Sequence, residues 1–208
     1  VYYFPSKENW LMVYVDDVII LGKSPDELFE RIKKKVLLRS TGELQEGQTI
    51  EFLGRQIKHE GDMIKIIPAK NYIQNMIEEN GMAKAKSVTT PGTKEIKVPG
   101  GVSVLSDQLT TTYRRGVGKL MWLIPIRPDI NFATKELSRS LAEPTEEDMA
   151  KMKHVIRYLI GTKQHTIEVT RQPMTHPEAT SEIHVYVDSD WAGCHSTRKS
   201  TTGCIIKL

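Results

Sequence analysis

The segment at residues 11–22, LMVYVDDVIILG, places two adjacent carboxylates inside a run with the apolar composition of a buried strand. Charged side chains are almost never fully buried unless they are paired or bind a metal. Successive side chains of a regular strand point to opposite faces, so Asp16 and Asp17 could not both reach one ion from within it. We therefore expect two strands, at residues 11–15 and 18–21, that meet in a turn at the acidic pair.

Two interpretations of this turn remain open on spacing alone. Both carboxylates can point to one side at a turn, where they repel each other unless a cation lies between them. Mg²⁺ accepts one or two carboxylates together with water and substrate phosphates, and paired Mg²⁺ ions stabilise phosphoryl transfer. The alternative is a solvated turn in which the two aspartates cap the bend.

The first helix is predicted to begin at Ser24, with Pro25 at the first helical position and Glu27 completing a capping box. Leu28, Ile32 and Val36 provide its apolar stripe. The basic run 33–35 is either a solvated helix face or a nucleic-acid contact.

Period-two alternation then predicts a hairpin over residues 49–68, with its turn at Glu60–Gly61–Asp62. After Pro68 the period changes to that of a helix, which we expect to stop near Asn80–Gly81. A long loop is expected at 87–111, rich in Pro, Gly, Ser and Thr.

Three helices are expected next, at residues 112–123, 129–141 and 145–160. The last has Thr145 as its N-cap and acidic residues in its first turn. A second loop at 171–181 precedes a strand in EIHVYVDSDWAG and an antiparallel partner in TTGCIIKL. The order of elements indicates an α+β fold.

Composition excludes several classes of protein. Of the 208 residues, 39% are hydrophobic and 26% are charged, which favours a folded chain over a disordered one. No apolar run is long enough to span a membrane, and we expect no secretion leader. Cys194 and Cys204 make no disulfide framework, which favours a reducing compartment. The formal net charge of +3 does not by itself identify a nucleic-acid-binding protein.

The string Tyr14-Val15-Asp16-Asp17 resembles the Tyr-x-Asp-Asp motif of reverse transcriptases, in the form common in copia-type LTR retrotransposons. Further segments are similar to that family and follow its order: EFLGRQI (51–57), AKNYIQNMIEENGM (69–82), TTPGT (89–93), YRRGVGKLMWLIPIRPDI (113–130), RYLIGT (157–162) and DSDWAGCHSTRKSTTGCI (188–205). The similarity covers nearly the whole chain, and the combination is specific. One departure is Asp148, which stands where family members often have His.

The resemblance implies a fragment of a Pol polyprotein that runs from the polymerase palm to the start of RNase H. It divides the chain into the C-terminal part of the palm with the primer-grip hairpin (1–67), a helical thumb (68–164), a linker (165–181) and the first strands of an RNase H-like α/β domain (182–208). The intact protein is then an RNA-directed DNA polymerase of the nucleotidyltransferase class.

Site residues follow from the same resemblance, each at the position that matches a family motif. Asp16, Asp17 and Asp188 are expected to be catalytic carboxylates that bind Mg²⁺, with Asp190 part of the second motif. Substrate-binding positions are expected near the primer end and the incoming nucleotide at Tyr14 and Val15, and in the primer grip at Phe52, Leu53 and Gly54.

The family's palm takes a third Asp from an earlier strand, and further RNase H carboxylates follow the position of Leu208. We therefore expect this chain alone not to polymerise DNA. Expected partners are an RNA template–DNA primer duplex, deoxynucleotides and the rest of the polyprotein, with no membrane. The expected location is cytoplasmic virus-like particles, or the nucleus with the integration complex.

Two other functions are compatible with the residues. One is a non-catalytic nucleic-acid-binding remnant or domesticated element, and the other is an unrelated soluble α+β domain whose acidic pair is only a turn. Intact acidic ligands in the flanking sequence would favour the enzyme over the remnant.

Overall fold

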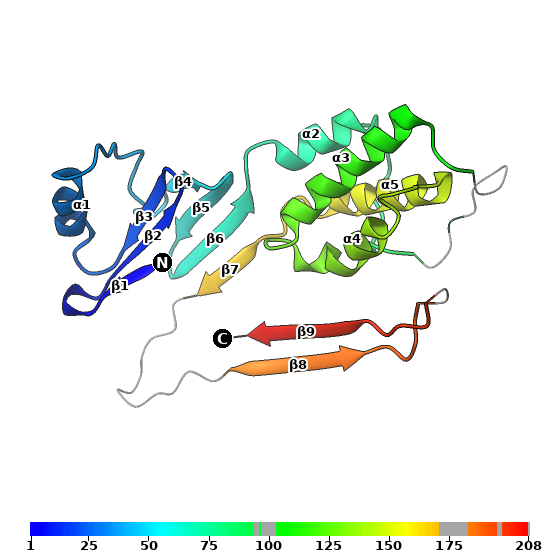
Figure 1. Cartoon of the computed structure of the whole chain (residues 1–208). Coiled ribbons are helices and arrows are strands. Elements are labelled where there is room, and N and C mark those ends of the chain that lie inside the picture. Colours follow the sequence, from blue (N-terminus) through cyan, green and yellow to red (C-terminus); the bar gives the residue numbers. More distant parts are fainter. Residues whose placement is uncertain (94–95, 97–102, 171–182, 195–196, 208) are drawn as a thin grey trace. The chain divides into compact units, whose positions relative to one another are not determined.

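A computed structural model describes residues 1–93, 96, 103–170, 183–194 and 197–207 (Figure 1). The chain divides into two compact units, Val1–Thr170 and Arg171–Leu208. Among the described residues all strand pairs are antiparallel, and four α-helices lie between residues 68 and 167, which agrees with the predicted α+β class.

The first sheet has three strands in the order β1 (Tyr2–Phe4), β2 (Asn9–Tyr14) and β3 (Asp17–Leu21). A short 3-10 helix, Pro5–Lys7, connects β1 to β2. Tyr14 pairs with Asp17, so β2 and β3 form the hairpin that the acidic pair predicted.

Helix α1 (Pro25–Lys33) follows β3 and is tied to the sheet by a buried asparagine. Asn9 is 2% exposed; its Nδ2 donates to the Ser24 carbonyl at 2.9 Å, and its Oδ1 accepts from the Ser24 N–H at 3.1 Å. The predicted capping box of Ser24 and Glu27 does not form. Asn9 already satisfies the backbone N–H that Glu27 would otherwise accept from. Val36 lies beyond the helix end and is exposed.

One face of this sheet is apolar but open, which contradicts the expectation of a buried strand. By the register, Tyr3, Trp10, Met12 and Tyr14 share that face, and they are 46%, 49%, 36% and 61% exposed, respectively. Helix α1 lies against the opposite face and covers part of it, around the buried Asn9.

The second sheet has four strands in the order β4 (Thr49–Phe52), β5 (Arg55–Glu60), β6 (Met63–Pro68) and β7 (Ile167–Thr170). The turn predicted at residues 60–62 is confirmed, but residues 49–68 form two hairpins rather than one. The missed turn is Leu53–Gly54. Strand β7 falls within the range predicted as linker, where it pairs with β6 and forms one edge of the sheet (Figure 1).

The four helices of the bundle are α2 (Tyr72–Glu79), α3 (Asp107–Leu123), α4 (Asn131–Ser138) and α5 (Glu146–Gly161), with a 3-10 turn at Pro128–Ile130 before α4. Gly81, at φ 67°, ends α2 as predicted: its N–H bonds the Glu78 carbonyl, and the Met82 N–H bonds the Ile77 carbonyl.

Helix α3 begins five residues before the predicted position, inside the segment expected to be a loop. Threonine is a poor helix former, which is why the run 110–112 indicated a loop. In the structure the hydroxyls of Thr111 and Thr112 donate to the carbonyls of Asp107 and Gln108, four residues earlier. Such bonds let threonine remain helical.

The hydrophobic core lies among these helices. Its fully buried members include Met76, Val117, Leu120, Met152 and Ile156. Ile66 of β6 packs against the same core, so the four-stranded sheet and the helices are joined by apolar contact. Tyr113 is fully buried and donates to the Leu137 carbonyl at 2.6 Å, linking α3 to α4.

The second unit contains β8 (His184–Ser189) and β9 (Thr202–Lys207), which pair as predicted. Every residue of both strands is exposed. The expected loop at 171–181 lies outside the described residues. None of the helices in the described residues has the length and apolar character needed to cross a membrane.

Candidate nucleic-acid and metal site

The β2–β3 turn presents the two adjacent aspartates. Val15 and Asp16 are the central residues, and Val15 has φ 55°. A β-branched residue in the left-handed region is a genuine outlier, and such strain often occurs at functional turns. Asp16 and Asp17 are both exposed, as are Tyr14 and Val15.

Neither Asp16 nor Asp17 has a hydrogen-bond or ion-pair partner among the described residues. In a turn capped by aspartate, the carboxylate accepts from backbone N–H groups. The turn is therefore held by strand pairing alone, and both carboxylates are accessible to a ligand. No group of three or more His, Cys, Asp or Glu residues gathers anywhere in the described part of the chain.

The β4–β5 turn holds the predicted primer-grip residues. Leu53 and Gly54 have φ 50° and 67°, the two positive values of a tight mirror-image turn. Phe52 and Leu53 are half-buried, whereas Gly54 is exposed at the tip. A Cβ on Gly54 would lie 3.3 Å from the Trp122 ring, so glycine allows the turn to rest on that indole.

Trp122 of α3 joins this turn to the bundle. Its ring stacks on Tyr72 with a centroid separation of 4.6 Å, and the Arg55 guanidinium lies 5.4 Å from its ring centroid. The Tyr72 hydroxyl donates to the Lys119 carbonyl at 3.2 Å. Turn, helix α2 and helix α3 therefore meet at one aromatic cluster.

Asp188 and Asp190 have different environments although they are two residues apart. Asp188 lies in β8 opposite Gly203 and is exposed. Asp190 follows the strand, and its Oδ1 accepts from the N–H groups of Thr201 at 2.7 Å and Gly193 at 3.3 Å. Asp190 therefore braces the loop between the two strands.

Two of the signature segments meet in a cluster that sequence reasoning missed. Arg127 is 1% exposed and forms a bidentate pair with Asp129, at 2.9 Å and 2.6 Å. Its other donors reach the carbonyl and hydroxyl of Thr162, at 2.9 Å and 2.7 Å. The Tyr158 hydroxyl donates to Asp129 Oδ2 at 2.8 Å. We refer to Arg127, Asp129, Tyr158 and Thr162 as the arginine cluster.

Charge in the arginine cluster is balanced internally. Burial disfavours the ionised form of Asp129, but hydrogen bonds from Arg127 and Tyr158 outweigh it and hold the pKa of this carboxyl below its ordinary value. Burial, followed by the hydrogen bond to Asp129, raises the pKa of Tyr158. The segments IRPDI and RYLIGT therefore stabilise the fold. In the sequence, their similarity to two family segments marked these residues but did not indicate that they contact each other.

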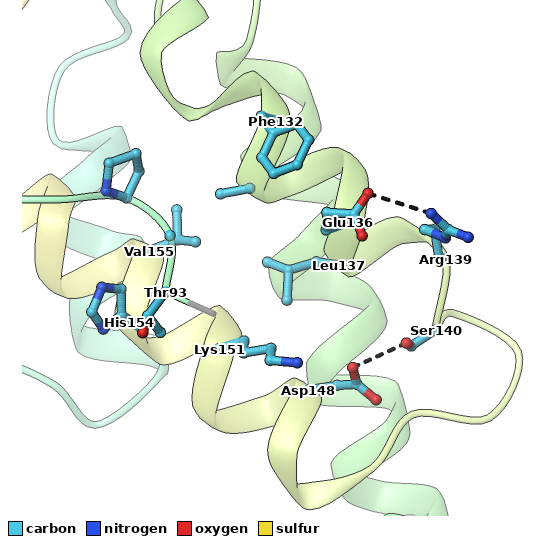
Figure 2. Close-up of a pocket in the computed structure, with 13 residues that line it drawn as sticks. Thr93, Phe132, Glu136, Leu137, Arg139, Ser140, Asp148, Lys151, His154 and Val155 are labelled. Carbon is cyan, nitrogen blue, oxygen red and sulfur yellow. Dashed lines mark hydrogen bonds and ion pairs between the residues drawn. The ribbon is translucent and has the colours of Figure 1, made fainter. Parts of the chain in front are cut away.

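Asp148, the departure from the family pattern, also has a structural role. Its Oδ2 accepts from the Thr145 N–H at 2.9 Å and the Thr145 hydroxyl at 2.8 Å. The Asp148 N–H donates to the Thr145 hydroxyl oxygen at 3.3 Å, completing a capping box. Ser140 donates to its Oδ1 at 3.0 Å, which ties the end of α4 to the start of α5 (Figure 2).

A pocket of about 550 Å³ lies beside Asp148, between α4, α5 and the loop at 90–93 (Figure 2). Its charged groups are engaged: Glu136 pairs with Lys135 and Arg139, Lys151 pairs with Glu147, and His154 contacts the Thr90 carbonyl. The pocket therefore presents no acidic cluster comparable to the Asp16–Asp17 turn.

Comparison with known proteins identifies the family. The chain is 33% identical over 195 residues to the uncharacterized mitochondrial protein AtMg00810 of Arabidopsis thaliana, covering 93% of this chain and 76% of the relative. It is 32% identical to the retrovirus-related Pol polyprotein from transposon RE1 of the same plant, over 96% of this chain. It is 31% identical to the corresponding polyprotein from transposon TNT 1-94 of Nicotiana tabacum, over 95% of this chain.

The chain spans only 13% and 15% of the lengths of these two polyproteins. No family model matches the sequence, and no solved structure matches it.

Proposed function

Since the chain belongs to the Pol polyproteins of copia-type retrotransposons, we propose that it is the palm-to-thumb portion of an RNA-directed DNA polymerase, followed by the start of an RNase H domain. The first unit contains the acidic turn, the primer-grip sheet and the thumb helices. In the intact protein this portion acts on an RNA template–DNA primer duplex and deoxynucleotides.

The observation that carries the proposal is the state of the acidic turn. Asp16 and Asp17 are exposed, adjacent and without a partner among the described residues, at the tip of a hairpin. A turn that served only the fold would gain stability by using these carboxylates as caps. Their availability supports a role in binding a cation that also contacts substrate phosphates.

Mg²⁺ fits this turn only in part. Two carboxylates from adjacent positions match what Mg²⁺ takes from a protein, but no third acidic group joins them among the described residues. A two-metal site needs more ligands than these two. We therefore propose that the intact polyprotein completes the site and that this chain alone does not polymerise DNA.

A primer-extension assay tests this proposal. The chain is incubated with a labelled DNA primer on an RNA template, deoxynucleotides and Mg²⁺ or Mn²⁺. We expect no extension by the chain alone and extension by a longer polyprotein segment that supplies the remaining palm. Replacing Asp16 by Asn in that longer segment should abolish its activity, whereas template-dependent synthesis by the chain alone would refute the proposed division of the site.

For the second unit we propose the first two strands of RNase H, with Asp188 as a metal-binding carboxylate. Asp188 is exposed on β8, whereas Asp190 is committed to its loop, and this difference supports Asp188 as the ligand. In a longer segment with the complete domain, replacement of Asp188 by Asn should abolish cleavage of RNA in an RNA–DNA hybrid.

A non-catalytic, nucleic-acid-binding remnant is the second candidate. The observation that favours it is that AtMg00810, a relative of modest length, aligns with this chain over 76% of its own sequence. Segments of this extent therefore occur outside full-length polyproteins. The remnant would be favoured if the chain binds the duplex and if replacing Asp16 or Asp17 leaves this binding unchanged in the presence of metal.

A further inference from the structure

Arg55, the first residue of β5, lies beside the Leu53–Gly54 turn and over the face of an aromatic ring. Its guanidinium carbon lies 5.4 Å from the centroid of the Trp122 ring, which in turn stacks on Tyr72. A guanidinium over an aromatic face keeps the donors along its edge available, and the contact restrains the position of the group. The side chain is therefore placed beside the turn before any ligand arrives.

Arg55 has no acidic partner among the described residues. Its Nε is buried and makes no hydrogen bond. Its cross-strand neighbours on the same face are Phe52 and Pro68, whose side chains carry no acceptor. Glu51 bonds Gln56, and Glu79 pairs with Lys119, so the nearby carboxylates are already used.

The arrangement contrasts with that of four other arginines in the first unit. Arg127 binds Asp129, Arg139 binds Glu136, Arg114 donates to two carbonyls, and Arg157 donates to the Lys86 carbonyl. Among the described residues Arg55 thus has no acceptor, and its two terminal nitrogens, unlike the buried Nε, are accessible to an external one.

We propose that Arg55 binds a backbone phosphate of the nucleic-acid duplex, with Trp122 as the residue that orients it. The planar fork of arginine matches phosphate oxygens in a bidentate manner, and a polyanionic backbone supplies such oxygens without sequence preference. The inference rests on the proposed function, because it takes the duplex as the ligand. It adds a specific phosphate contact beside the predicted grip residues.

The first experiment measures duplex binding by the full chain as a function of salt. Fluorescence anisotropy of a labelled DNA primer on an RNA template gives the dissociation constant at several KCl concentrations. Replacing Arg55 by Ala should weaken binding roughly tenfold at low salt and reduce the salt slope by about 0.7–0.9, the value expected for one lost phosphate contact. Arg55→Lys should retain the slope but bind more weakly, because lysine lacks the planar fork.

Arg31 offers a matched control, because its guanidinium lies 5.9 Å from the Phe4 ring centroid on another part of the unit. Arg31→Ala removes the same charge and the same kind of stack, and we expect it to leave the salt slope nearly unchanged. Thermal melts of all variants report whether each one folds.

A second experiment locates the phosphate. Single neutral methylphosphonate linkages are placed along the primer strand and, separately, along the template strand. At one position, the neutral linkage should weaken duplex binding by wild type but not by Arg55→Ala. The strand that carries this linkage, primer or template, is the one whose phosphate Arg55 binds. If Arg55→Ala fails to fold, the same comparison is made with Arg55→Gln, which keeps a long side chain but removes the charge.

The outcomes separate the inference from the function on which it rests. If wild type binds the duplex but no linkage couples to Arg55, and Arg55→Ala matches Arg31→Ala, the inference is wrong and the proposed function stands. If wild type does not bind the duplex at any salt concentration, the proposed function and the inference both fail.

Discussion

The aspartates of the helical bundle and those of the β2–β3 turn differ in how many hydrogen bonds their carboxylates accept. Asp129 accepts three hydrogen bonds from Arg127 and Tyr158, and Asp148 accepts three from Thr145 and Ser140. Asp16 and Asp17 accept none among the described residues. These aspartates of the first unit thus divide into those that hold the structure and those that remain available for a ligand.

The largest effect is expected for the arginine cluster. Replacing Arg127 by Ala removes four donor contacts and leaves Asp129 with one side-chain hydrogen bond, from the Tyr158 hydroxyl. Breaking a buried pair in this way should cost about 3 kcal/mol or more of unfolding free energy, measured by urea denaturation followed by circular dichroism. Arg139→Ala, which breaks an exposed pair with Glu136, should cost about 0–1 kcal/mol. Equal losses of unfolding free energy in Arg127→Ala and Arg139→Ala would show that the buried arginine stabilises the fold no more than the exposed one.

Acid should weaken the same cluster. Because the pKa of Asp129 is lowered in the folded state, its contribution to stability is present above the unfolded pKa of about 3.9 and is lost as pH falls through the folded value. The urea midpoint should therefore decrease below pH 4 in wild type. The decrease should be smaller in Asp129→Asn, and an identical pH profile would show that Asp129 is not the group responsible.

A smaller effect is expected at the start of α5. Asp148→Ala removes one half of the capping box and the bond from Ser140, and should destabilise the chain by about 1 kcal/mol. Asp148→Asn keeps an acceptor and should lose less. Thermal or urea melts check that Asp148→Ala is the more destabilised of the two. The Ser140→Ala variant measures how much of the loss comes from the Ser140–Asp148 bond between α4 and α5.

The smallest effect on stability is expected at the acidic turn. Asp16→Asn and Asp17→Asn should change the unfolding free energy by no more than about 0.5 kcal/mol, because neither carboxylate supports the fold. Relief of repulsion between the two charges could make the change favourable. A loss as large as that of Asp148→Ala would mean that the turn needs its carboxylates.

Local signals in the sequence predicted much of the fold. Gly61 and Gly81 mark a turn and a helix end, and Thr145 marks a helix start; the structure places all three as expected. The Leu53–Gly54 turn was missed because leucine rarely adopts a positive φ and gives no turn signal. Strand β7 was missed because its partner β6 lies about a hundred residues earlier, and no local pattern reports such pairing.

The site was predictable to a different degree. The sequence placed Asp16 and Asp17 at a turn, but it gave no information on whether their carboxylates would cap that turn. The arginine cluster joins residues 127 and 162, so its hydrogen bonds depend on tertiary packing of α5 against the 3-10 turn. The same holds for Asn9, which replaces the predicted capping box at Ser24 through a contact fifteen residues away.

Metal binding at the acidic turn tests the central claim most directly. Mn²⁺ is titrated into the chain in the presence of the primer–template duplex, and free Mn²⁺ is measured by electron paramagnetic resonance. We predict that the double variant Asp16→Asn/Asp17→Asn binds fewer Mn²⁺ ions than wild type while it melts at the same temperature. Equal binding by wild type and the double variant would contradict the claim that this turn holds its carboxylates for a metal.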